Sequence, residues 1–304
     1  MHESILNSGG YRYLWFSVLL VALSVLLYAW HSPGEPANGG TWLGYTLGAI
    51  SAGLIFWLMF FGIRKRSYMS STGSARGWVS AHIYLGTSLI ILATLHSGFQ
   101  FGWNVHTLAW VLMILVIISG MYGVFAYLRY PTLMTQNRAD MTRAAMLDEI
   151  AQLDEDALRL ADRIDTDVHA VVSRSVQRTK IGGSMWQQLR AHNEYEQAIL
   201  KADELLHKKE RQADTGVAQK AAGDQDDTMV AMIDYLSRTA DSERAADVRR
   251  LLDLLSRKKY LAARLTRDIQ YQAFMDIWLY IHVPLSFALL GALIAHIITV
   301  FFYW

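Results

Sequence analysis

Residues 78–98 read WVSAHIYLGTSLIILATLHSG, and residues 277–304 read IWLYIHVPLSFALLGALIAHIITVFFYW. Both stretches are long and apolar enough to cross a membrane as helices. Each carries two histidines 14 residues apart, His82 with His96 and His282 with His296. Fourteen residues of helix rise ~21 Å in just under four turns, so the two histidines of a pair share one helix face. Ionisable side chains at membrane depth are costly, so two matching pairs indicate a function.

The spacing of these histidines is that expected for the ligands of two haems. If the two spans stand side by side and run in the same direction, His82 meets His282 and His96 meets His296. We therefore predict two haem b groups, an inner one between His82 and His282 and an outer one between His96 and His296. The chain has no cysteine, which excludes covalently attached haem and thiolate-held clusters.

Three further apolar stretches predict membrane spans at residues 13–30, 42–63 and 106–128. The fold class is thus an all-α membrane protein with five transmembrane helices. The loops after the first and third spans contain no lysine or arginine, whereas the loop after the second contains four. By the positive-inside rule, the N-terminus and residues 131–271 are cytoplasmic, and we expect a bacterial cytoplasmic (inner) membrane as the location.

The charged residues are concentrated between residues 131 and 271, which hold 24 of the 27 acidic and 22 of the 28 basic side chains. Helical periodicity runs through most of this segment, and from Ser242 it continues without a breaker into the last span. The predicted organisation is an N-terminal tail (1–12), a membrane domain (13–130), a cytoplasmic helical domain (131–271) and a fifth span (272–304). That fifth span completes a four-helix haem-binding bundle.

Small and basic residues near the predicted haems are candidate binding residues. A macrocycle between helices needs close backbone approach, which favours glycine, and charged propionates need basic partners at the membrane edge. Glycines are also common in membrane helices, and basic residues at a cytoplasmic boundary also follow from topology. The candidates are Gly48, Gly62 and Gly86 for the macrocycle and Arg64, Arg66 and Arg76 for the propionates.

His106 stands apart from the two pairs, at the outer end of the fourth span. It can be an interfacial polar residue, an alternative ligand of the outer haem, or part of a quinone or proton site together with Trp103. A neutral imidazole accepts a proton near neutral pH, as quinol oxidation requires.

The paired histidines, with the glycine pair Gly48 and Gly62, resemble the diheme b-type cytochrome superfamily. That group includes the cytochrome b of bc complexes and the ferric-reductase-like transmembrane proteins. The resemblance covers roughly residues 42–130 and 272–304; the first span and residues 131–271 depart from it. It implies transmembrane electron transfer but specifies neither donor nor acceptor.

From these observations we expect electron transfer through two haems, as the cytochrome b subunit of a redox complex exchanging electrons with quinone or a partner protein. The cytoplasmic helices would dock a partner subunit or a second copy of the chain. A net charge of +1 gives no indication of nucleic-acid binding. The alternatives are a quinol- or metal-ion-reducing oxidoreductase acting at the outer haem, a non-redox signalling or scaffold protein, and a metal or proton transporter.

Overall fold

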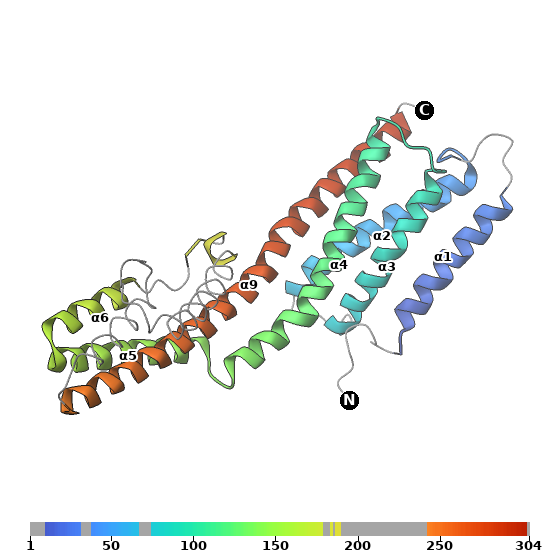
Figure 1. The fold of residues 1–304 in the computed structure, drawn as a ribbon. Coiled ribbons are helices and arrows are strands. Elements are labelled where there is room, and N and C mark those ends of the chain that lie inside the picture. The colour runs from blue at the N-terminus through green and yellow to red at the C-terminus, as the bar shows by residue number, and fades with distance from the viewer. Residues whose placement is uncertain are drawn as a thin grey trace, which may run out of the picture. The chain divides into compact units, whose positions relative to one another are not determined.

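The computed structural model describes residues 10–31, 38–66, 74–178, 183–184, 186–189 and 242–302, without the side chains of residues 63–66, 178 and 242–243. Within these residues the protein is helical and contains no strand. The helices, coloured in chain order in Figure 1, are α1 (Arg12–Trp30), α2 (Trp42–Arg66), α3 (Ala75–His96), α4 (Val105–Arg138), α5 (Arg143–Ile164), α6 (Thr166–Arg178) and α9 (Ser242–Phe302).

The chain divides into two compact units, one formed by Met1–Phe125 with Ile277–Trp304 and the other by Ala126–Asp276. These divisions fall within a few residues of the boundaries that the change in charge density suggests. Helix α9 is continuous over 61 residues, so the prediction of an unbroken helix leading into the last span is confirmed. Helix α4 likewise continues through Pro131 to Arg138, beyond the predicted end of the fourth span.

Five helices, α1, α2, α3, α4 and α9, contain segments that are long and apolar enough to cross a membrane. Helix α1 has the polarity of a lipid-facing span, because its buried residues are Ser17 and Ser24. The side chains of Trp15 and Leu26, in contrast, are each 67% exposed. An apolar exterior over small polar buried residues suits a hydrocarbon solvent and not water. The structure is therefore consistent with a multi-pass membrane protein.

Four helices of the first unit share one hydrophobic core. Ile55 and Leu58 come from α2, Met113 comes from α4, and the rest of the core is contributed by α3 and α9. Helix α1 packs on α3, where the Ser17 hydroxyl donates to the carbonyl oxygen of Tyr84 at 2.9 Å. The remaining core residues are Ala81, Leu85, Leu89, Leu289 and Leu293.

The second unit is built on α5, α6 and the first part of α9, whose apolar faces pack together. Thr142 caps α5 by accepting from the backbone N–H of Ala145 at 3.1 Å, and Asp165 ends this helix in an extended conformation. The periodic pattern predicted this helix. The same helical periodicity also indicates a helix around residues 184–209, but this stretch lies almost entirely outside the described residues.

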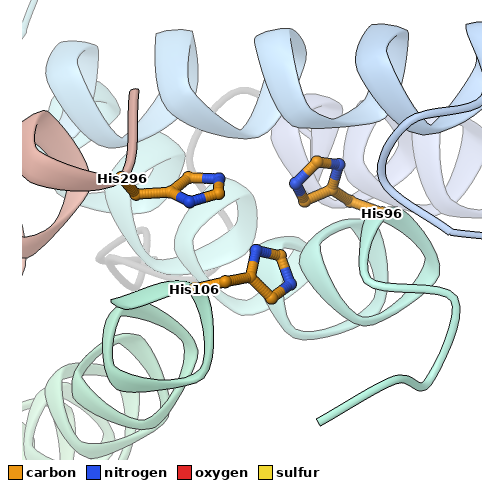
Figure 2. Close-up of side chains that lie close together, drawn as sticks. All are labelled: His96, His106 and His296. Atoms are coloured by element: carbon orange, nitrogen blue, oxygen red, sulfur yellow. The ribbon is translucent and has the colours of Figure 1, made fainter. Parts of the chain in front are cut away.

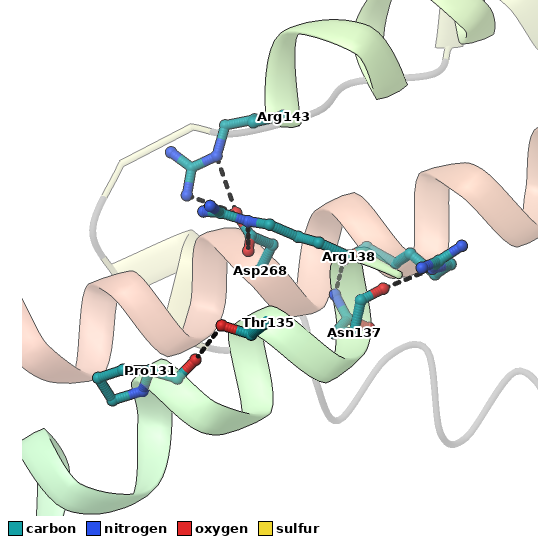
Figure 3. Close-up of polar contacts among 7 residues, drawn as sticks. Pro131, Thr135, Asn137, Arg138, Arg143 and Asp268 are labelled. Atoms are coloured by element: carbon teal, nitrogen blue, oxygen red, sulfur yellow. Dashed lines mark hydrogen bonds and ion pairs between the residues drawn. The ribbon is translucent and has the colours of Figure 1, made fainter. Parts of the chain in front are cut away.

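A buried carboxylate joins α4, α5 and α9 within the second unit (Figure 3). Asp268, which is fully buried, accepts from Arg138 at 2.6 and 2.9 Å and from Arg143 at 2.9 and 2.7 Å. Beside it, Arg264 donates to the carbonyl oxygen of Asn137 at 2.6 Å. One buried anion shared by two guanidinium groups fixes the register of three helices, since separating them would leave the charge unpaired.

Candidate haem and metal centre

The histidine-bearing helices of the first unit are arranged at two levels. At one level, which we call the 96/296 level, His96 of α3 and His296 of α9 lie together. At the other, the 82/282 level, His82 of α3 and His282 of α9 lie in the same part of the bundle. Because α3 and α9 thus present their histidines in the same order, these two segments run in the same direction. Helix α4 runs oppositely, with His106 at the 96/296 level.

Three imidazole rings converge at the 96/296 level (Figure 2). The ring centres of His96 and His296 are 6.1 Å apart. The His106 ring is 5.2 Å from that of His96 and 4.9 Å from that of His296. One ligand nitrogen from each residue lies within 4.8 Å of the other two. The three side chains are only partly buried and come from three different helices.

Helix α2 fixes the orientation of His96. The Nδ1 atom of His96 lies 2.7 Å from the carbonyl oxygen of Gly44, which can only accept, so Nδ1 carries the proton. This leaves the Nε2 lone pair free for a ligand, the arrangement found in metal-binding histidines. A β-carbon at Gly48 would stand 2.6 Å from the His96 ring, so the ring fits against α2 only because this position is glycine.

At the 82/282 level, a short chain of hydrogen bonds on α4 positions His282. Its Nδ1 is 2.8 Å from the Ser119 hydroxyl, and that hydroxyl donates to the carbonyl oxygen of Val116 at 2.8 Å. A serine hydroxyl has one proton, so while it donates to Val116 it accepts from His282, which again leaves Nε2 free. The indole N–H of Trp278 donates to the Ser119 carbonyl oxygen at 2.7 Å and holds the same turn of α4.

His82 has fewer polar neighbours than His282. Its ring packs against Phe61 of α2 at 5.1 Å, and the backbone of Leu58 lies near it. The buried Nδ1 of His82 makes no well-formed hydrogen bond within the described residues. His82 is therefore held mainly by apolar packing, with the backbone of Leu58 as its nearest polar neighbour.

The structure places the other predicted binding residues in different surroundings. Among the described residues, nothing lies within 4 Å of a β-carbon at Gly62, and at Gly86 only Leu58 does, at 3.8 Å. Arg76 is exposed at the start of α3, and Trp103 is fully exposed. The side chains of Arg64 and Arg66 lie outside the described residues. Of the predicted glycines, therefore, Gly48 makes the close approach, and it does so against a histidine ring.

The structure places the His106 ring against both outer histidines, which is compatible with its predicted role as an alternative ligand at the outer level. Sequence reasoning missed Ser119 and Trp278, which position His282. A polar residue within an apolar span is a possible signal for Ser119. The partner of Trp278 is evident only in three dimensions, because the residues that it contacts are far away in the sequence.

In comparisons with known proteins, no family model, no curated protein and no solved structure matches this chain. The function must therefore be inferred from the side chains of the bundle, their distances and their chemistry.

Proposed function

We propose that the first unit binds two haem b groups, one at each histidine level, and carries electrons across a membrane. The observation that carries the proposal is the 6.1 Å separation of the His96 and His296 rings. His82 and His282 precede them by 14 residues on the same two helices. A metal–nitrogen bond of about 2 Å on each side, with each ring centre about 1 Å beyond its nitrogen, places two axial imidazoles about 6 Å apart.

The orientation of the ligand rings supports this proposal. His96 and His282 each direct Nδ1 to an oxygen of a neighbouring helix, Gly44 and Ser119 respectively. Both therefore present Nε2 as the ligand atom, and their ring planes are held before any ligand arrives.

The two levels differ in how readily a haem would fit. A haem held by His96 and His296 would need the space between their rings, and the His106 ring, at 5.2 and 4.9 Å from the two, borders that space. Haem at this level thus requires His106 to turn away. His106 is the second residue of α4, so its side chain can rotate toward the preceding loop. At the 82/282 level, the Phe61 ring lies 5.1 Å from that of His82 and the Trp278 ring 5.2 Å from that of His282.

Bis-histidine haem supplies one-electron transfer and leaves no open coordination position for oxygen. Fourteen residues of helix separate the levels by ~21 Å, which covers most of a hydrocarbon core of ~30 Å. Arg76 precedes His82 by six residues on the same helix and remains the candidate propionate partner on that side. We place the N-terminus and the second unit in the bacterial cytoplasm, on the basis of the basic loops.

The second unit offers a surface for a partner subunit. An open groove between α5 and α9 is lined by Arg159, Arg163, Arg249 and Arg250, with two aspartates and two leucines. Arg159 and Arg250 already pair with acidic side chains of the same unit, which leaves a modest excess of positive charge that favours an acidic protein surface, such as that of a soluble redox protein. A second copy of this chain is the other candidate occupant.

The test is haem quantification on the full chain purified from haem-replete cells. Pyridine haemochrome should give two haems per chain, with reduced-minus-oxidised bands of low-spin b haem. His82→Ala and His282→Ala should each lose the same haem, and His96→Ala and His296→Ala the other. The control is His169→Ala, because His169 lies in the second unit, outside the bundle. A chain without haem, or equal haem in all five variants, would refute the proposal.

A second candidate function is quinol oxidation at the 96/296 level, favoured by the position of His106. This half-buried imidazole contacts both outer ligand rings and follows a loop in which Trp103 is fully exposed. It could accept the proton released when a quinol gives up an electron. Loss of quinol-dependent haem reduction in His106→Ala, with both haems retained, would support this function.

A further inference from the structure

We infer that His96, His106 and His296 form a binding site for a borderline transition-metal cation of the zinc or copper class. We further infer that this cation and a haem at the 96/296 level exclude one another. The inference depends on the rings of His96, His106 and His296, and it is independent of whether haem binds at the 82/282 level. It assigns to His106 a ligand role that a bis-histidine haem site does not use.

The geometry is that of an open three-ligand site. Around a tetrahedral ion with bonds of about 2 Å, ligand nitrogens lie about 3.3 Å apart, so atoms already within 4.8 Å need to close by about 1.5 Å or less. The three residues come from the end of α3, the start of α4 and the last part of α9. His106 is the second residue of α4, so rotation of its side chain can shorten its distances to the other two.

The donor set selects the class of metal. All three donors are imidazole nitrogens, which suit zinc, copper and nickel, whereas magnesium and calcium require oxygen ligands. The chain has no cysteine, and no acidic residue lies in the described part of the first unit. With three neutral ligands the cation keeps its charge and an open fourth position, which would bind water or an anion.

The protein already holds one of the three candidate ligands, His96, through a hydrogen bond to its backbone. The hydrogen bond from His96 Nδ1 to Gly44 fixes the tautomer in which Nε2 is available, as histidine ligands of metals normally require. Gly39 and Gly48 leave space for this ring, since a β-carbon at either position would lie 3.3 or 2.6 Å from it. The His96 ring is therefore oriented before the ion binds.

Exclusion of haem follows from the place of His106. Its ring is nearly equidistant from the other two, at 5.2 and 4.9 Å, and so borders the space that a macrocycle would need. A cation draws the His106 ring inward, whereas a haem requires it to leave. Both occupants also use His96 and His296, so the two cannot bind together.

The experiment is a zinc titration of the full chain, without an affinity tag, purified in detergent from haem-depleted cells. Calorimetry should detect one Zn²⁺ per chain, and Co²⁺ should give the intense visible absorption of a tetrahedral ion. His106→Ala, and the size-conserving His106→Gln, should each weaken zinc binding by ~100-fold or more, since even outer-shell changes cost 10–100-fold. His169→Ala is the control variant, and circular dichroism of each variant verifies helix content.

The outcomes separate this inference from the haem proposal. Unchanged zinc binding in both His106 variants, or a chain that holds two haems and one Zn²⁺ together, would overturn the inference. Zinc binding that requires His106 in a chain that never binds haem would leave the inference standing and refute the haem proposal. If both assignments are correct, added haem displaces Zn²⁺ one for one, and His106→Ala keeps both haems while losing the cation.

Discussion

The indole ring of Trp278 lies directly against the backbone of Gly123, where a β-carbon would stand 2.2 Å from the nearest ring atom. From this position the indole N–H reaches the Ser119 carbonyl oxygen at 2.7 Å, and the Ser119 hydroxyl meets His282. A glycine on α4 thus determines how closely α9 approaches and where a candidate ligand ring points. Four predictions concern Gly123 and Ser119 near His282, Gly48 near His96, and Asp268 in the second unit.

Gly123→Ala should displace Trp278 and disturb His282. The added methyl group overlaps a rigid ring beside backbone, and overpacking of this kind costs about 1–3 kcal/mol. We expect the haem at the 82/282 level to be lost and the one at the 96/296 level to be retained, so that pyridine haemochrome falls from two to one per chain. Tryptophan fluorescence should shift even in a haem-free sample. Gly291→Ala is the matched control, because nothing lies within 4 Å of its β-carbon.

Ser119→Ala should raise the midpoint potential of one haem. Donation from His282 Nδ1 to the serine oxygen makes the imidazole a stronger donor, which stabilises the oxidised iron, and alanine removes this effect. A spectroscopic redox titration measures the change. Ser88→Ala is the control, because Ser88 is also buried and bonds only to the carbonyl oxygen of Leu85 on its own helix. Identical potentials in all three proteins would contradict the assigned role of Ser119.

Gly48→Ala should damage the 96/296 level alone. Its β-carbon would lie 2.6 Å from Cε1 and 2.7 Å from Nδ1 of His96, so the ring must move and its hydrogen bond to Gly44 must break. Zinc affinity of the haem-free chain should fall by ~10-fold or more. Gly53→Ala on the same helix has free space at its β-carbon and should behave as the parent chain. Equal loss in both variants would indicate a general effect on α2.

Asp268→Asn should destabilise the second unit by about 3 kcal/mol, because two arginines lose the anion that they share in a buried site. The arginine side chains are 34% and 39% exposed and can regain some hydration, so a larger loss is not expected. Hydrogen exchange of backbone amides in α5 and α9 should accelerate. The control is Glu155→Gln, which removes an exposed ion pair with Arg159 and should cost about 0.5 kcal/mol or less.

The continuity of α9 and the five apolar spans could be predicted from the sequence, because both depend on local composition and on the absence of helix breakers. The pairing of His96 with His296 could also be predicted, because His82 and His282 each follow the last charged residue before their span by six residues, which sets equal depths on parallel helices. The outer location of His106 could be predicted as well, because it begins the fourth span. That its ring contacts both His96 and His296 could not be predicted, since no periodicity links it to either residue.

By itself the sequence determined that this chain is helical, that five segments are suited to a membrane and that its histidines fall into two matched pairs. These properties depend on hydrophobicity and helix period, which act over a few residues. Only the tertiary structure decided that three imidazoles meet at one level, that Ser119 and Trp278 hold His282, and that Gly48 makes room for a ring. Such contacts join residues far apart in the chain, and they depend on how helices pack and on which backbone atoms a glycine leaves accessible.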